Sequence, residues 1–299
     1  SDSTPGVPDV LFGVPCHLFD ACAEPGPASG APGAVVARRD AAILRATRDG
    51  GVWIGHARRA DTDLTFKLPV GLAFPAEIDR LPARPVAVDA PGGGYRELRY
   101  EEANGIGYLH FPFYNGAMST TQCERLLAGY RHALARPTRV LVLTGGPDFW
   151  SNGIHLNVIE AAHSPADESW RNINAIDDVT QAIIETGDRL VVAALQGNAG
   201  AGGVFMALAA DEVWARQGVL LNPHYKNMGN LYGSEYWTYL LPQRVRTGKP
   251  ETVMQDRLPL SAARAQRVGL VDAVFARDPA QFMRDVRDRA ESLAADTGL

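Results

Sequence analysis

One stretch of the chain, HYKNMGNLYGSEYW at residues 224–237, combines acid–base groups with aromatic rings. A carboxylate among rings is poorly solvated when ionised, so its pKa rises toward the working pH and it can exchange protons there. Glu235 is the candidate for this role, and Tyr225 is a candidate partner in the same pocket. The rings expected around Glu235 belong to Tyr232, Tyr236, Trp237 and Tyr239.

The same stretch has simpler interpretations. An isolated glutamate beside aromatic residues is commonly solvated or salt-bridged, and the whole segment would then be an aromatic surface loop. His224 is an alternative acid–base group, although a lone histidine next to a proline is commonly a structural hydrogen bonder. His155 is a further candidate of the same kind.

Two turns of small residues follow apolar strand patterns, at Asn152-Gly153 and at Gly202-Gly203. In both places the pattern predicts that the chain passes from a strand into a helix. Peptide N–H groups at a helix start are unpaired and lie at the positive end of the helix dipole. Two of them converging on one carbonyl oxygen would form an oxyanion hole. Alternatively, the glycines only allow tight packing between strand and helix.

The composition excludes several classes of function. The 29 basic and 34 acidic residues give a net charge of −5 without a basic cluster, which argues against nucleic acid as a partner. Cys16, Cys22 and Cys123 form no CxxC pair, and no metal-ligand spacing is present. No apolar run reaches the roughly 20 residues that cross a bilayer, and the first residues lack the features of a signal peptide. We therefore expect a cytoplasmic protein without a metal or a membrane anchor.

The elements that must position these residues change character along the chain. At 1–76, three runs of strand length, AVVARR, AAILRATR and VWIGHARR, are separated by turn signals and predict a small β module. The segment 77–94 is dense in proline and glycine and has no helical periodicity, which is typical of a linker. From 95 to 299, strand and helix patterns alternate, which predicts an α/β domain.

Within this α/β domain, GIGYLHFP, TRVLVLTGG and RLVVAALQG predict strands. STTQCERLLAGYRHALA predicts an amphipathic helix with Ser119 as its N-cap, and ESWRNINAIDDVTQAIIET predicts another helix. Both glycine turns come after one of the predicted strands.

Three segments of this domain, LVLTGGPDFWSNGIHLN, ALQGNAGAGGVFMALAADEVWA and LSAARAQRVGLVDAVF, resemble the enoyl-CoA hydratase/isomerase (crotonase) superfamily in order and spacing. The resemblance implies a crotonase-like ββα superhelix and a coenzyme A thioester as ligand. It also implies that the backbone N–H groups of Asn152 and Gly202 are the two oxyanion donors. Phe205 stands where hydratases have a catalytic glutamate, and GVLLNP lacks their second glutamate. Hydration is therefore not expected, because a fold does not fix a reaction.

GVLLNPHYKNMGNLYGSEYWTYLLP is similar to the C-terminal part of hydrogenase maturation proteins of the HypX (HoxX) family. PGVPDVLFGVPCHLFDA and KLPVGLAF resemble the OB-like β-barrel module that follows a formyltransferase domain in that family. The family implies that an upstream domain, or a separate polypeptide, transfers a formyl group from formyl-tetrahydrofolate to coenzyme A. The present domain would convert formyl-CoA into carbon monoxide and CoA. The carbon monoxide becomes an iron ligand of a NiFe hydrogenase, so hydrogenase maturation proteins are expected partners.

The resemblance also assigns roles in the opening stretch. Glu235 would remove the formyl proton and deliver a proton to the departing sulfur. Tyr225 would orient the formyl group or hydrogen-bond Glu235, and Lys226 could contact a CoA phosphate. The substrate pocket would include Phe205, His224, Tyr232 and Trp237.

Two alternatives to decarbonylation stay open. The domain could catalyse another reaction of the crotonase fold, such as thioester hydrolysis or isomerisation. It could also be an inactive domain that binds an acyl-CoA or a maturation partner.

Overall fold

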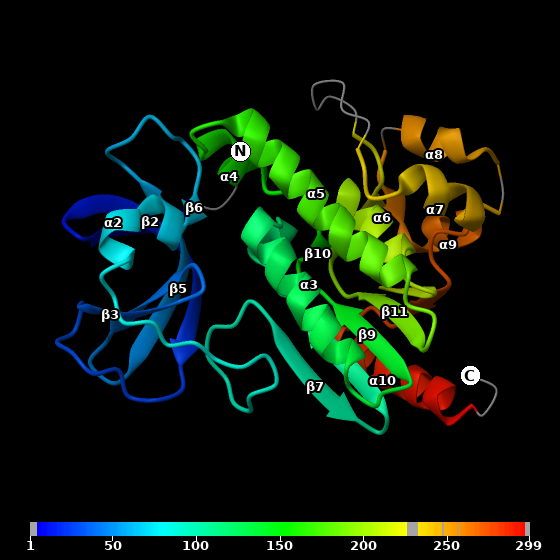
Figure 1. Cartoon of the computed structure of the whole chain (residues 1–299), viewed down its shortest axis with the longest axis horizontal. Coiled ribbons are helices and arrows are strands. Elements are labelled where there is room, and N and C mark those ends of the chain that lie inside the picture. Colours follow the sequence, from blue (N-terminus) through cyan, green and yellow to red (C-terminus); the bar gives the residue numbers. More distant parts are fainter. Residues whose placement is uncertain (1–4, 226–232, 247, 257, 297–299) are drawn as a thin grey trace. The chain divides into compact units, whose positions relative to one another are not determined.

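The computed structural model describes residues 5–225, 233–246, 248–256 and 258–296. The chain forms two compact units, Ser1–Glu97 with Asn157–His163 and Leu98–Leu156 with Ser164–Leu299. Figure 1 labels their helices and strands. No helix in the described part of the chain is long and apolar enough to cross a membrane.

The first unit is built on an antiparallel sheet with strand order β1-β2-β5-β4-β3 and with β6 beside β5. The strands are β1 (Val7–Leu11), β2 (Val14–Glu24), β3 (Val35–Arg39), β4 (Ala42–Ala46), β5 (Gly51–Arg59) and β6 (Leu68–Pro69). The three predicted runs form β3, β4 and β5. The sequence analysis did not predict β1 as a strand, and its Pro8 is tolerated because β1 is an edge strand.

Short helices complete this unit: α1 (Val70–Ala73), α2 (Pro75–Ile78) and α4 (Leu156–Ala161), of which residues 157–161 belong here. Val158 of α4 packs in the same apolar cluster as Ile54 of the sheet and Phe74. The sequence pattern predicted a helix after the Asn152-Gly153 turn, but not that residues 157–163 belong to the first unit, because that grouping depends on contacts between residues far apart in the sequence.

The segment 77–94, predicted as a linker, groups with the first unit. The Arg38 N–H donates to the Pro82 carbonyl at 3.0 Å, and the Arg84 N–H donates to the Arg38 carbonyl at 2.8 Å. The guanidinium of Arg39 adds a bond to the Arg84 carbonyl at 2.9 Å. Part of the segment is therefore hydrogen-bonded along β3.

The second unit has a larger sheet of strand order β16-β13-β11-β9-β8-β7, in which only the β7–β8 pair is antiparallel. Its strands are β7 (Arg99–Ala103), β8 (Ile106–His110), β9 (Val140–Thr144), β11 (Leu190–Leu195), β13 (Glu212–Arg216) and β16 (Ala273–Phe275). A smaller sheet of order β10-β12-β14-β15 consists of β10 (Phe149–Ser151), β12 (Asn198–Gly200), β14 (Leu220–Asn222) and β15 (Leu260–Ser261).

The second unit also contains helices. They are α3 (Thr120–Leu134), α5 (Pro165–Ile184), α6 (Gly202–Leu208), α7 (Trp237–Arg244), α8 (Pro250–Gln255), α9 (Ala262–Val268) and α10 (Pro279–Ala295), with a 3₁₀ turn η1 (Tyr114–Gly116). Phe282 and Val286 of α10 pack in one cluster with Val142 of β9, so α10 covers one face of the sheet. Helices α3 and α5 lie side by side in Figure 1. The predicted N-cap of α3 is confirmed, because the Ser119 hydroxyl accepts the Gln122 N–H at 3.3 Å.

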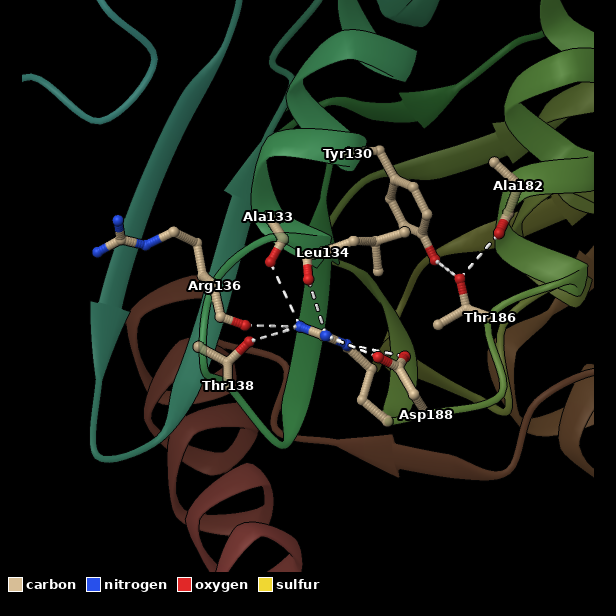
Figure 2. Close-up of polar contacts among 9 residues, drawn as sticks. Tyr130, Ala133, Leu134, Arg136, Thr138, Ala182, Thr186 and Asp188 are labelled. Atoms are coloured by element: carbon tan, nitrogen blue, oxygen red, sulfur yellow. Dashed lines mark hydrogen bonds and ion pairs between the residues drawn. The ribbon is translucent and has the colours of Figure 1, made fainter.

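Arg189 hydrogen-bonds the C-terminal end of α3, and Figure 2 labels Leu134, Arg136 and Asp188, with which it interacts. Arg189 donates to the carbonyl oxygens of Leu134 at 2.8 Å and Arg136 at 3.0 Å, and it pairs with Asp188 at 2.9 Å. The last carbonyls of a helix lack partners within the helix, and a cation there also complements the helix dipole. Arg189 therefore fixes α3 to the start of β11.

Candidate active site

The two glycine turns predicted from the sequence lie against each other. Strand β10 pairs in parallel with β12, with Ser151 opposite Ala199, so the turns that follow the two strands are neighbours. An ideal Cβ built on Gly153 would lie 3.2 Å from the backbone nitrogen of Gly202. Gly153 also has φ +77, so glycine is required there both by the backbone and by the close approach.

The two predicted oxyanion donors differ in their surroundings. Gly202 is the first residue of α6, so its N–H has no partner within the helix. The Asn152 N–H, in contrast, donates to the carbonyl oxygen of Gly116 at 2.7 Å. The turn after Gly153 also does not lead straight into a helix, because α4 begins only at Leu156. The Asn152 N–H is thus hydrogen-bonded within the protein, and its role as the second oxyanion donor stays a prediction.

Glu235 and Tyr225 are brought together, as the sequence suggested. The Tyr225 hydroxyl donates to Oε2 of Glu235 at 2.6 Å, and both side chains are buried. The Ser234 N–H donates to the same oxygen at 3.1 Å. On its other side the carboxylate reaches the second glycine turn, where an ideal Cβ on Gly202 would lie 1.9 Å from Oε1.

Two aromatic residues surround this pair. Phe205 is fully buried on α6 and stacks on the Tyr225 ring, with ring centroids 6.0 Å apart and an interplanar angle of 17°. Trp237 lies 6.5 Å from Phe205 between ring centroids. Tyr236 and Tyr239 were also expected around Glu235, but both are exposed. Tyr232 and Lys226 lie outside the described residues.

Burial raises the pKa of Glu235, and the negative charge of Asp177 raises it further, while the hydrogen bond from Tyr225 lowers it. The pKa of Tyr225 is also raised, first by burial and then by the charge of Glu235. Tyr225 is therefore a hydrogen-bond donor at neutral pH. The pKa of Glu235 is thus higher than that of a solvated carboxylate, which is the direction of shift that a general acid–base carboxyl group needs.

The two histidine candidates are placed differently. His155 is buried, and its backbone N–H donates to Oδ1 of Asn172 at 3.1 Å. His224 is half-buried and directly precedes Tyr225. Among the described residues, no group of three or more His, Cys, Asp or Glu side chains could hold a metal ion.

Sequence reasoning missed two residues next to the pair. Asp177 on α5 accepts the Glu235 N–H at 2.7 Å. Gly233 has φ +72, and an ideal Cβ there would lie 2.0 Å from Cζ of Tyr225. The position of Gly233 two residues before the candidate acid was a usable signal. No comparable sequence signal marked Asp177, because an acidic residue on a helix is ordinarily solvent-exposed.

Residues 106–298 match the Enoyl-CoA hydratase/isomerase family. Over 299 residues the chain is 55% identical to the hydrogenase maturation factor HoxX of Bradyrhizobium diazoefficiens, and it spans 51% of that protein. The crystal structure of HypX from Aquifex aeolicus in complex with tetrahydrofolic acid superposes with a TM-score of 0.95 and 49% identity, over all of this chain and 53% of that one.

A further solved structure shows the fold alone. The enoyl-CoA hydratase from Thermoplasma volcanium is 23% identical, with a TM-score of 0.57, over 65% of this chain and 77% of that one. The chain spans about half the length of HoxX and HypX. The predicted crotonase-like α/β fold and the resemblance to the HypX (HoxX) proteins are confirmed by these matches. Because the family match covers more than half of the sequence, the chain belongs to the enoyl-CoA hydratase/isomerase family.

Proposed function

We propose that this protein decarbonylates formyl-CoA to carbon monoxide and free CoA, for maturation of a NiFe-hydrogenase active site. The observation that carries the proposal is the buried Tyr225–Glu235 pair beside Gly202. The similarity to a hydrogenase maturation factor supports the biological role. The tetrahydrofolic acid bound to the related HypX supports a one-carbon acyl group, because folates carry such groups.

The proposed reaction needs only one group that accepts a proton and then returns it. The carboxylate of Glu235 takes the formyl proton, and the electron pair of that C–H bond becomes the carbon lone pair of carbon monoxide. The C–S bond breaks at the same time, and its electron pair leaves with sulfur. The thiolate then receives the proton from Glu235, which regenerates the carboxylate. Tyr225 holds Oε2 of Glu235, so Oε1, the oxygen facing Gly202, is the one that exchanges the proton.

The surroundings of the pair favour this reaction over hydration. Phe205 occupies the helix position at which a hydratase presents a glutamate, and a phenyl ring cannot activate water. Phe205 and Trp237 also reduce the room for water near the carboxylate. A dry pocket matters because a water molecule would convert the thioester to formate instead.

The hydrogen bond that the Asn152 N–H makes within the protein favours decarbonylation over thioester hydrolysis. Hydrolysis passes through a tetrahedral oxyanion, which two N–H donors stabilise by about 3–4 kcal/mol each. Loss of carbon monoxide builds no negative charge on the carbonyl oxygen, so one donor at Gly202 suffices to orient it. The second amide, that of Asn152, is already used by the Gly116 carbonyl at 2.7 Å.

The remaining assignments belong to the same proposal. Residues 1–76 form the OB-like module of formyltransferase type, 77–94 connect it, and 95–299 form the crotonase-like catalytic domain, which acts in the cytoplasm. His224 and Trp237 complete the proposed substrate pocket with Phe205. Formyl-CoA is supplied by a formyltransferase domain upstream or on a separate polypeptide, and the partners are hydrogenase maturation proteins.

A gas-release assay tests the proposal. The protein is incubated with formyl-CoA, carbon monoxide is trapped by reduced haemoglobin, and formate and free CoA are quantified in parallel. Removing a general acid–base group costs about 10²- to 10⁴-fold, so Glu235→Gln should lose at least about 100-fold of the gas release. Tyr225→Phe should lose less, because it removes a hydrogen bond and keeps the carboxylate. The exposed residues Glu251 and Tyr239 provide the controls Glu251→Gln and Tyr239→Phe.

The products separate the rival functions. Formate without carbon monoxide would identify a thioester hydrolase. CoA binding without any product would identify a binding domain. Carbon monoxide release that survives Glu235→Gln would overturn the assignment of the base.

A further inference from the structure

Glu235 sits on strained backbone. Its φ is +41, and the following residue, Tyr236, has φ +54, so two successive residues with side chains are in the left-handed region. Residues other than glycine adopt this region at a cost, and they stay there only when their surroundings hold them. Something outside the turn must therefore fix residues 235 and 236.

Helix α5 supplies two anchors for this turn. Oδ1 of Asp177 accepts the Glu235 N–H at 2.7 Å. One helical turn further, Oε1 of Gln181 accepts the Tyr236 hydroxyl at 3.2 Å. Asp177 and Gln181 are four residues apart, so they lie on one face of α5.

We propose that Asp177 is a positioning residue for Glu235, with Gln181 as a second anchor. Asp177 holds the main chain of Glu235 in the left-handed turn, and the turn presents the carboxylate to Gly202. The proposal rests on the proposed function, in which Glu235 is the catalytic acid–base group. Asp177 bonds the backbone N–H of Glu235, and in this proposal it has no role in the chemical step.

The carboxylate and the peptide N–H of Glu235 are thus held by different parts of the structure. Tyr225 and the Ser234 N–H hold Oε2 of the carboxylate, at 2.6 and 3.1 Å, while α5 holds the peptide N–H. Loss of the α5 anchor would leave the carboxylate bound to Tyr225 but would let the turn relax. The distance from Oε1 to the thioester would then change, and a misplacement of about 1 Å can cost about 100-fold in rate.

The charge of Asp177 has a second effect that can be measured, a change in the pKa of Glu235. Among the described residues, the titratable groups that interact with Glu235 are Tyr225, Asp177 and the buried thiol of Cys123 on α3. Asp178 in turn acts on Asp177. Asp177 raises the pKa of Glu235. Burial raises the pKa of Asp177, and the bond from the Glu235 N–H lowers it. Removing the charge of Asp177 should therefore lower the pKa of Glu235.

Three variants on α5 separate the anchor from the charge. Asp177→Asn keeps an oxygen acceptor and removes the charge, while Asp177→Ala removes both. Asp178→Ala removes a neighbouring exposed carboxylate and serves as the matched control. Asp177→Ala should lower kcat about 100-fold with KM nearly unchanged. Asp177→Asn should retain most of kcat, and the acidic limb of its pH–rate profile should move to lower pH.

Amide hydrogen exchange at Glu235 tests the anchor without reference to activity. Asp177→Ala should accelerate this exchange at least about tenfold, whereas Asp177→Asn and Asp178→Ala should leave it near the wild-type rate. If wild-type protein releases no carbon monoxide but this exchange pattern holds, the proposed function fails and the anchor stands. Equal exchange in all three variants, or equal kcat in Asp177→Ala and wild type, would overturn the positioning role.

Discussion

The carboxylate of Glu235 fills the space that a side chain on Gly202 would need. An ideal Cβ on Gly202 would lie 1.9 Å from Oε1 and 2.8 Å from Oε2 of Glu235. Gly202 begins a regular helix, so its backbone does not itself require glycine. The glycine is needed at this position because it lets an acidic residue from a distant segment reach the turn.

Gly202→Ala should therefore disable the site without unfolding the protein. The new methyl group must displace the Glu235 carboxylate, because the two cannot share the space, and we expect a loss of about 100-fold in kcat for formyl-CoA. Gly187→Ala is the matched control, since no described atom lies within 4 Å of a Cβ there. Carbon monoxide release and a melting curve should be measured for both. A fully active Gly202→Ala would show that the carboxylate is not needed beside this turn.

Gly233→Ala should act on the other member of the pair. A methyl group at this position would lie 2.0 Å from Cζ of Tyr225, and φ is +72 there. Gly218→Ala carries the same kind of backbone strain, at φ +97, without a described neighbour within 4 Å. Strain alone costs about 1 kcal/mol, so Gly218→Ala should be slightly destabilised and active.

The measurement for Gly233→Ala is gas release at a temperature at which both variants are folded. We expect Gly233→Ala to lose activity in addition to stability, because the Tyr225 ring must move away from Glu235. If both glycine variants lose the same stability and keep the same activity, the ring position does not matter for catalysis.

Several strands and the two long helices α3 and α5 could be predicted because their apolar patterns reflect burial within one element. The β9 and β11 runs, and the capping signal at Ser119, depend on residues close in sequence. The pairing of Glu235 with Tyr225 was reachable because they are ten residues apart in one segment. These features need no knowledge of how distant elements pack.

The features that the sequence did not reveal depend on distant contacts. Asp177 meets the Glu235 N–H from 58 residues away, and nothing in AIDDV marks it as an anchor. The Gly116 carbonyl takes the Asn152 N–H from a loop whose conformation no local pattern defines. Tyr236 and Tyr239 were expected near Glu235 because they are close in sequence. The left-handed turn at 235–236 instead leaves both exposed.

Arg189 provides a stability prediction away from the site. Its side chain is largely buried and donates to carbonyl oxygens at the end of α3. Arg189→Met would leave these acceptors without their partner, which should lower the free energy of unfolding by about 2–4 kcal/mol. The control is Arg284→Met, because Arg284 is exposed and bonds Gln281. Chemical denaturation measures both, and equal, small losses would contradict the capping role.

The pH dependence of stability should report the burial of Glu235. Because its pKa is raised in the folded state, the folded protein binds this proton more tightly than the unfolded chain does. The stabilisation is fully present below the unfolded pKa, near 4.5, and is lost as pH rises through the folded pKa. Glu235→Gln stays neutral and avoids this loss.

Relative to wild type, Glu235→Gln should therefore gain stability as the pH rises from about 4 to about 8, because only the wild-type side chain must ionise while buried. Urea denaturation across this range measures the difference in unfolding free energy between the two proteins. Glu251→Gln, at an exposed position, should show no such trend. A difference that stays constant with pH would mean that Glu235 ionises equally well in the folded and unfolded states, and the case for a tuned acid–base residue would be lost.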